Sequence, residues 1–217
     1  MHILLVDDHP LIIDSYKLCL FSSIPNMESV RFSTAQTCEE AYHLIQTTSF
    51  EQSFTLAILD YRIPQCTAKG LFSGVDLAEV IKKLMVNCKV IVSTSYSEMI
   101  LIYDLVQNRH LNGVMIKSDL TAESIAQGVQ QVLNDEIFQS PAVKNIVTEI
   151  RKNDIMADAI NRKILLSIDN GYRVKDLESL VSLSTSSIKR RIAQMKDSLG
   201  ILEGGSLIKE AKLQGYI

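Results

Sequence analysis

The sequence predicts an α/β domain followed by a small all-helical domain. Five short apolar runs alternate with segments of helical periodicity over about the first 135 of the 217 residues. Short connections of this kind imply right-handed crossovers and a doubly wound parallel sheet, in a (βα)5 arrangement. Residues 154–217 contain helical patterns only. We therefore expect a first domain over 1–135, a connection over 136–153 and a helical domain over 154–217.

The composition is that of a soluble globular protein, with 47% hydrophobic and 22% charged residues. No apolar run reaches the roughly 18 residues of a membrane span, and the N-terminus lacks the pattern of a signal peptide. We therefore expect a cytoplasmic protein with no membrane partner. The four cysteines are isolated, which favours reduced thiols over disulfides or zinc ligands. Residues 1–153 contain 12 basic and 17 acidic residues, whereas residues 154–217 contain 10 and 8, which indicates different partners for the two parts.

The stretch FTLAILDYRIP, residues 54–64, contains the central element of the first domain. Its apolar run, 56–59, predicts a strand that is buried on both faces, and the run stops at Asp60. Ligands of open α/β sheets bind outside the carboxyl ends of the strands, so we expect Asp60 to lie at such a site. Pro64 favours a turn just after the acid.

Three other predicted strands are also followed by polar or charged side chains, which we expect at the same edge of the sheet as Asp60. The runs at 2–6, 89–93 and 113–116 lead into Asp7 and Asp8, Thr94, and Lys117, respectively. Neighbouring carboxylates repel, and a hard divalent cation such as Mg²⁺ relieves that repulsion. A hydroxyl and an ammonium group suit the oxygens of a transferred phosphoryl group. Each residue alone could be a helix cap, a turn hydroxyl or a solvated charge, but together they indicate phosphoryl transfer onto Asp60 as the nucleophile.

The segments LLVDDHP, LAILDYRIP, VIVSTS and GVMIK make residues 1–135 resemble the receiver domain of two-component response regulators, which has a flavodoxin-like fold. The resemblance implies that Asp60 accepts a phosphoryl group from a histidine kinase. It also implies a Mg²⁺ site and contacts to the phosphoryl group. The residues for the metal are Asp7, Asp8, Asp60 and the backbone carbonyl of Arg62, and those for the phosphoryl group are Thr94 and Lys117. No enzyme activity is implied beyond phosphotransfer to the domain itself and its autodephosphorylation.

The chain departs from the family pattern close to this site. The segment from Pro64 to Gly74 is longer than is usual in the family. The segment between Thr94 and Lys117 is also slightly longer, which leaves Ser93 or Ser95 as alternative sources of the hydroxyl.

Two further departures concern how a signal leaves the site. Val114 occupies the switch position, where the family often has a rotating Tyr or Phe, and Ser118 stands where a cis-proline often follows the lysine. They leave open a regulator that does not depend on phosphorylation and whose receiver serves as a dimerisation or partner-binding module. A phosphatase-like enzyme is a third class, but it would need a second acid at position 62, where the chain has Arg62.

The sequence predicts helices in both the connection and the last domain. A helix is expected over 142–151 within the connection, and others over 156–168, 174–181, 185–198 and 205–214. A short helix, a turn at 182–184 and a longer helix are typical of a helix-turn-helix unit. Ser184 suits the N-cap of the longer helix.

The helix over 185–198 carries the candidates for DNA contact, whose hydroxyls and cations suit phosphates and base edges in a major groove. They are Ser186, Ser187, Lys189, Arg190, Arg191 and Lys196. A solvated basic face is the plainer alternative. The spacing of Gly171, Leu177, Val181, Ser184, Ile188, Lys189 and Leu199-Gly200 resembles the LuxR/NarL-type helix-turn-helix. That resemblance implies double-stranded DNA as a partner, with Lys189, Arg190 and Arg191 as the main contacts.

Glu178 stands where that family usually has a small Ala between the two helices. Taken together, the two resemblances predict a response regulator that controls transcription. Phosphorylation on Asp60 would switch the formation of a homodimer and the binding of DNA.

Overall fold

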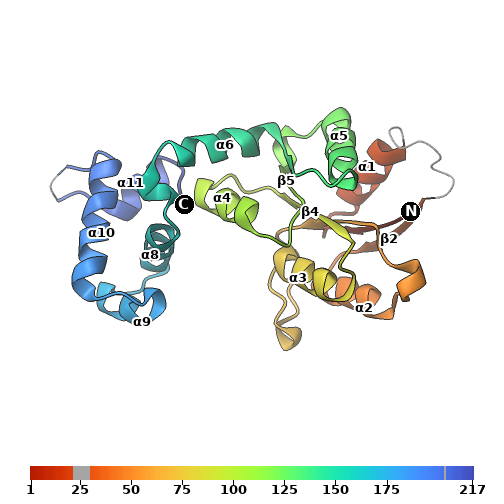
Figure 1. The fold of residues 1–217 in the computed structure, drawn as a ribbon, viewed down its shortest axis with the longest axis horizontal. Helices are drawn as coiled ribbons and strands as arrows, with labels where there is room; N and C mark the ends of the chain where they lie inside the picture. Colours follow the sequence, from red (N-terminus) through yellow and green to blue (C-terminus); the bar gives the residue numbers. More distant parts are fainter. Residues whose placement is uncertain (22–29, 203) are drawn as a thin grey trace. The chain divides into compact units, whose positions relative to one another are not determined.

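The structure, a computed structural model, describes residues 1–21, 30–202 and 204–217 (Figure 1). The chain forms two compact units. Unit 1 comprises residues 1–96 and 105–143, and unit 2 comprises residues 97–104 and 144–217. Residues 136–143, which the sequence analysis assigns to the connection, are thus part of unit 1.

Unit 1 is built on a parallel six-stranded sheet with the order β2-β1-β3-β4-β5-β6. The strands are β1 (His2–Val6), β2 (Arg31–Ala35), β3 (Leu56–Asp60), β4 (Lys89–Thr94), β5 (Gly113–Ile116) and β6 (Phe138–Gln139). The predicted fold class, a doubly wound parallel sheet, is confirmed. The sequence placed the second strand two residues early, at 29–32, of which residue 29 lies outside the described residues. It missed β6 altogether.

Helices cover both faces of the sheet (Figure 1). One face is covered by α1 (Pro10–Phe21) and α5 (Ala122–Leu133), and the other by α2 (Cys38–Thr47) and α3 (Gly74–Leu84). The core beneath α1 and α5 contains Ile3, Leu5, Ile58, Ile91 and Met115 from the sheet. All five residues of β3 are buried, because β3 lies inside the sheet and both of its faces are covered.

The sixth strand is held by a close contact between Phe138 and Gly128. A Cβ atom on Gly128 would lie 2.6 Å from the ring of Phe138, so glycine at this position of α5 leaves room for the ring. Phe138 is part of the same core cluster, and β6 pairs with β5 in parallel register. A two-residue strand gives no alternating pattern for a sequence analysis to detect.

Side-chain caps fix where the helices begin. Thr37 accepts a hydrogen bond from the backbone N–H of Glu40 at 3.1 Å, as the sequence predicts for α2. The Glu40 carboxylate accepts a hydrogen bond from the N–H of Gln36 rather than from that of Thr37, so the expected reciprocal pair is shifted by one residue. At α3, Ser73 and Asp76 form a complete capping box.

The long segment before α3 forms an ordered turn. Cys66 and Leu71 exchange backbone hydrogen bonds of 2.9 and 3.1 Å, and Gly70 adopts a left-handed conformation at φ 67° between them. Cys66 and Leu71 are both buried. The extra residues therefore add a compact hairpin-like turn beside the end of β3.

Gly74 lies directly against the backbone of Asp60. A Cβ atom at Gly74 would lie 2.2 Å from the Asp60 carbonyl oxygen. We expect Gly74→Ala to lower the free energy of unfolding by about 1–3 kcal/mol, because the junction between β3 and α3 must move apart. Urea unfolding measures this loss. Gly70→Ala is the control, since it meets no atom within 4 Å and tests backbone strain alone. A loss at Gly74 no larger than that at Gly70 would contradict the expectation.

Two buried thiols should make the free energy of unfolding fall as the pH rises above 9. Burial raises the pKa of Cys38 to about 11 and that of Cys88 to about 12, from an ordinary value of 9.0. The folded state therefore keeps these protons more tightly than the unfolded state. Their stabilising contribution is complete below pH 9 and is lost as the pH rises towards 11 or 12. Each thiol accounts for a slope of at most about 1.4 kcal/mol per pH unit.

This slope can be measured by urea unfolding between pH 9 and pH 11. We expect Cys88→Ala to make the decline of the unfolding free energy shallower by up to about 1.4 kcal/mol per pH unit. Cys19→Ala, at a half-buried position, is the control. Parallel declines for the native chain and Cys88→Ala would show that the thiol does not contribute.

Unit 2 contains a bundle of short helices. The helix α6 (Pro141–Arg151) begins in unit 1 and continues into unit 2, and the first part of α4 (Met99–Gln107) is grouped with unit 2. The remaining helices are α7 (Asp154–Ala157), α8 (Ala159–Asp169), α9 (Leu177–Val181), α10 (Thr185–Ser198) and α11 (Leu207–Leu213). The single helix predicted over 156–168 is divided at Asp158 into α7 and α8, because Asp158 caps a new helix. The helix predicted over 174–181 begins as a 3-10 turn before α9, α11 is shorter than the predicted 205–214, and α10 has its predicted bounds. Among the described residues, no helix has the length and apolar character needed to cross a membrane.

Candidate functional site

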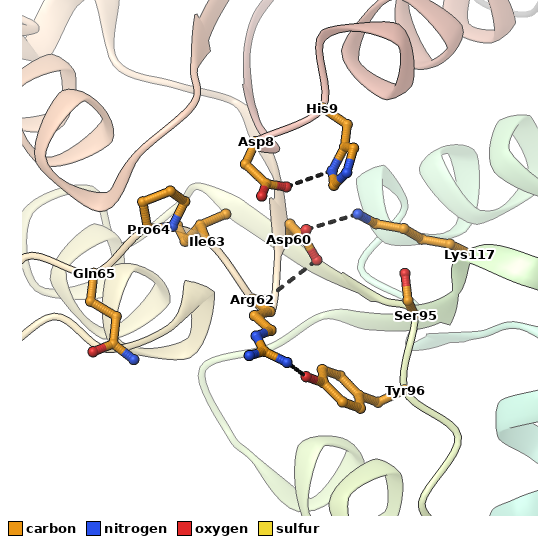
Figure 2. A pocket seen from close by; sticks show the side chains of 10 residues that line it. All are labelled: Asp8, His9, Asp60, Arg62, Ile63, Pro64, Gln65, Ser95, Tyr96 and Lys117. Carbon is orange, nitrogen blue, oxygen red and sulfur yellow. Dashed lines mark hydrogen bonds and ion pairs between the residues drawn. The ribbon is translucent and has the colours of Figure 1, made fainter.

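Three side chains meet at the carboxyl edge of the sheet in unit 1. Asp60 ends β3, Asp7 follows β1, and Lys117 follows β5 in the one-turn 3-10 helix Lys117–Asp119. The Lys117 Nζ atom lies 2.8 Å from Asp60 Oδ2 and 2.7 Å from Asp7 Oδ2 (Figure 2 shows the pair with Asp60). Because the strands are parallel neighbours, residues that are distant in sequence converge here. The expected convergence of Asp7, Asp60 and Lys117 is therefore present in the fold.

Asp7 and Asp8 form a second group with His9. The His9 Nδ1 atom lies 2.6 Å from Asp8 Oδ1 and 3.5 Å from Asp7 Oδ1, and the ligand atoms of all three lie within 4.8 Å of one another. Asp7 is buried, whereas Asp8 is open to solvent. Two carboxylates at this distance provide oxygen donors of the kind that Mg²⁺ prefers. His9 follows the acid pair directly in the sequence, but the sequence analysis did not assign it a role.

The pKa values of the acid and the base of this site are both raised, for opposite reasons. Burial raises the pKa of Asp60, and the nearby Asp7 carboxylate adds to that rise, although the hydrogen bond from Lys117 opposes it. Burial alone would lower the pKa of Lys117, but its hydrogen bonds to Asp60 and Asp7 outweigh burial and raise its pKa. Lys117 thus remains an ammonium group that compensates part of the carboxylate charge.

A cavity of about 470 Å³ opens next to Asp60 (Figure 2). Its lining residues come from the ends of β1, β3, β4 and β5: Asp8, His9, Asp60, Arg62, Ile63, Pro64, Gln65, Ser95, Tyr96 and Lys117. The space borders the carboxylate and the ammonium group at once. It can therefore admit a small anion next to both.

The three candidate hydroxyls occupy different environments. Ser93 is buried beneath the site, where its Oγ atom lies 2.8 Å from the Tyr16 hydroxyl. Thr94 is also buried, and its hydroxyl oxygen accepts a hydrogen bond of 3.0 Å from the N–H of Tyr96. Of the three, Ser95 is exposed and is the one that lines the cavity. The bond to Tyr16 argues against Ser93, and Thr94 and Ser95 remain candidates for the hydroxyl role.

A pair that the sequence analysis did not foresee flanks the cavity. The Arg62 guanidinium donates a hydrogen bond to the Tyr96 hydroxyl (Figure 2). The backbone N–H of Arg62 faces Asp60 Oδ1 at 3.4 Å. Their positions, each two residues after a strand end, were a signal available in the sequence. Val114, at the predicted switch position, is buried in β5 and presents no aromatic ring.

In unit 2, α9 and α10 form a helix-turn-helix, with Ser182 in a left-handed conformation at the turn. Ser184 caps α10 by accepting a hydrogen bond from the N–H of Ser187, as the sequence predicts. The Glu178 carboxylate accepts hydrogen bonds from the N–H and the hydroxyl of Thr185. Glu178 therefore joins α9 to the first turn of α10, which explains how an acid replaces the usual small residue.

The predicted DNA-contact residues of α10 fall into two groups. Ser186, Lys189 and Arg190 are exposed, and Ser187 is half-buried. Arg191 instead donates hydrogen bonds to Asp158 at 3.1 Å and Asn161 at 2.8 Å.

Lys196 also has a partner within unit 2, because its Nζ atom donates a hydrogen bond to the Gly205 carbonyl at 2.8 Å. The exposed face that holds Lys189 and Arg190 continues through Ala193 and Gln194, four residues further on. Helical periodicity from the basic pair could have identified these two positions. Two of the six predicted residues, Arg191 and Lys196, are thus bonded within unit 2. The exposed face extends further along α10 than predicted, to Gln194.

Residues 3–125 match a protein family described as the response regulator receiver domain, and this match covers more than half of the chain. No curated protein sequence shows significant similarity. Solved structures of RcsB have a similar fold. One contains two RcsB dimers bound to two parallel DNAs, with a TM-score of 0.65, 14% identity and 98% of each chain covered.

A second is an RcsB–DNA complex, with a TM-score of 0.64, 15% identity and 98% of each chain covered. A third is RcsB from Salmonella enterica serovar Typhimurium, bound to the promoter P1flhDC in the presence of the phosphomimetic BeF₃⁻. Its TM-score is 0.62 at 16% identity, with 97% of each chain covered. At these identities the similarity establishes the fold of the chain, including a helical domain after the sheet.

Proposed function

The chain belongs to the response regulator receiver family, and from this premise we propose that it is a DNA-binding response regulator switched by phosphorylation on Asp60. The proposal is supported by the convergence of Asp60, Asp7 and Lys117 at one cavity. The donor of the phosphoryl group would be a cognate histidine kinase. The protein would act in the cytoplasm.

In the proposed reaction, a carboxylate oxygen of Asp60 attacks the phosphorus atom of a phosphohistidine. The P–N bond breaks as the new P–O bond forms, and the imidazole leaves with the electron pair and is then protonated. Lys117 lies where its ammonium group can pair with the transferred group, since it already contacts Asp60. Autodephosphorylation by water would return Asp60 to its starting state, so no other enzymatic turnover is proposed.

Asp7, Asp8, Asp60 and the backbone carbonyl of Arg62 are the residues proposed to hold Mg²⁺. Asp7 and Asp8 fit such an ion by their all-oxygen donors and short separation, and Asp8 is open to solvent as a hydrated ion requires. When bound, Mg²⁺ would neutralise charge on the acids and on the phosphoryl oxygens. Asp60 lies outside the close group of Asp7, Asp8 and His9 and is tied instead to Lys117.

A hydroxyl at the end of β4 is proposed to bond the phosphoryl group, and Thr94 is the predicted donor. We expect Thr94→Ala to slow phosphoryl uptake from acetyl phosphate about tenfold, the effect of losing one hydrogen bond in the transition state. Thr94→Ser should retain most of the rate. Ser95→Ala should stay within about twofold of the native rate. A slow Ser95→Ala with an unaffected Thr94→Ala would transfer the role to Ser95, which lines the cavity.

The proposed partner of unit 2 is double-stranded DNA. Ser186, Lys189 and Arg190 are exposed at the start of α10, the second helix of a helix-turn-helix, which is the end that enters a major groove. A homodimer is proposed, because paired helices double the contact with DNA. Two RcsB structures support these partners, since one contains dimers bound to DNA and the other is a complex with DNA.

A regulator that does not depend on phosphorylation remains the second candidate. It is favoured by one observation: Lys117 already bridges Asp7 and Asp60, so part of the acid charge is compensated within the chain. In that case unit 1 would serve as a dimerisation or partner-binding module. The absence of an aromatic switch at Val114 fits the same view.

Analytical ultracentrifugation with and without Mg²⁺ and beryllofluoride separates the two candidates. A shift from monomer to dimer that requires the mimic and is lost in Asp60→Asn supports the phosphorylation switch. If the mimic does not bind, the second candidate takes its place.

A further inference from the structure

The turn that carries Lys117 also holds the start of α6. This turn is the 3-10 helix Lys117–Asp119, which follows β5 directly. Lys117 at its beginning contacts Asp60 and Asp7. Asp119 at its end accepts a hydrogen bond of 2.6 Å from the N–H of Ala142 through Oδ2. Two groups with different partners are thus only two residues apart.

Asp119 acts as a cap supplied from another part of the chain. Pro141 is the first residue of α6 and lacks an N–H group, so Ala142 has the first N–H of the helix that needs a partner. A carboxylate at this end also interacts favourably with the helix dipole. Asp119 therefore stabilises the first turn of α6 by both charge and hydrogen bonding.

Ser140 adds hydrogen bonds between the start of α6, Asp119 and β5. Its hydroxyl donates a hydrogen bond to Asp119 Oδ1 at 3.1 Å and accepts one from the N–H of Ile116 at 3.3 Å. Its own N–H donates to the Val114 carbonyl at 3.1 Å. Ser140 is fully buried, so these bonds do not compete with water. The start of α6 is thus joined to β5 at two positions, Val114 and Ile116, and Ile116 directly precedes Lys117.

We propose that Asp119 is the positioning residue through which the state of the Asp60 site reaches α6. This inference rests on the proposed function and deepens it by naming the route of regulation. A phosphoryl group on Asp60 gives Lys117 a new anionic partner, and the turn of three residues must adjust when Lys117 moves. Asp119 then shifts with the same turn, and the cap of α6 changes. The helix continues to Arg151, whose neighbours belong to unit 2.

This route does not need an aromatic side chain at the switch position. Val114 offers no aromatic ring to rotate in response to the hydroxyl at β4. The structure shows the Asp119 cap bonded, and in the proposed route the cap breaks when Lys117 moves. A two-state element of this kind is what coupling requires. Both arrangements can be distinguished by the exchange of the Ala142 amide hydrogen.

The test is amide hydrogen exchange of the full chain with Mg²⁺, with and without beryllofluoride. In the native chain we expect the mimic to change exchange over the first turn of α6 by about fivefold or more. In Asp119→Ala, the mimic should still bind, as followed by ¹⁹F NMR, but exchange at α6 should no longer respond. Glu123→Ala removes an exposed acid from the first turn of α5 and is the matched control.

Ser140→Ala provides a second variant in case Asp119→Ala is unstable. It removes one hydrogen bond to Asp119 while the bond to Ala142 can remain, and the response at α6 should be reduced. A full response at α6 in both variants would overturn the inference while leaving phosphorylation of Asp60 intact. If the mimic fails to bind even the native chain, the proposed function itself is wrong.

Discussion

Replacing Asp60 by Asn is expected to abolish phosphoryl uptake. The amide oxygen is a poor nucleophile, and the neutral side chain no longer attracts Lys117. We expect the rate of labelling from acetyl phosphate or a phosphorylated histidine kinase to fall by at least about a thousandfold, as it does in enzymes that lose their nucleophile. Denaturing gel electrophoresis of the labelled protein measures the covalent product directly.

The matched control is Asp14→Asn on α1. Asp14 is an exposed acid whose partner is Lys17, at 3.2 Å, and it is not part of the cavity wall. Asp14→Asn should leave the rate of labelling unchanged. Labelling of Asp60→Asn at the native rate would place the acceptor on another residue, and Asp8, an acid in the same cavity, would be the first to test.

Removal of the exposed charges of α10 is expected to weaken DNA binding strongly. If Lys189 and Arg190 each contact a phosphate, their joint replacement by Ala should lower affinity about 60-fold at 0.1 M salt. The slope of log affinity against log salt concentration should fall by about two. Fluorescence anisotropy with a mixed-sequence DNA duplex measures both quantities, because phosphate contacts do not depend on the sequence.

Two controls separate the loss of contact from the loss of folding. Lys163→Ala removes an exposed charge from α8 and should change the salt slope by less than about one. Arg191→Ala breaks the bonds to Asp158 and Asn161 and should lower the melting temperature of the chain. An unchanged affinity after the double replacement would remove α10 from the DNA interface.

The sequence was informative wherever one local pattern determines a local outcome. Continuous apolar runs placed four of the strands to within a residue, and the acid at the end of β3 was correctly placed at the sheet edge. The N-cap at Ser184 and the bounds of α10 were also predictable, since a capping residue and a helical period act within a few residues.

Other features depend on pairs of residues that no single pattern links. The bonds from Arg191 to Asp158 and Asn161 join α10 to the start of α8, whereas the sequence pattern placed Arg191 among the main predicted DNA contacts. The resemblance predicts that Lys117 pairs with a phosphoryl group, and it did not show that Lys117 also bridges two acids in the structure. Both differences arise because partners 30 or more residues apart compete with the predicted contact.

The contact between Phe138 and Gly128 has a consequence for synthesis of the chain. The core of unit 1 lacks one aromatic ring until the segment after α5 has emerged from the ribosome, and an empty space of that size costs about 3–5 kcal/mol. A nascent chain that ends near residue 135 would also leave β5 paired with β4 alone, as an exposed edge of the sheet. Unit 1 therefore reaches its full stability only after residue 143 is available, when the first residues of α6 have been added.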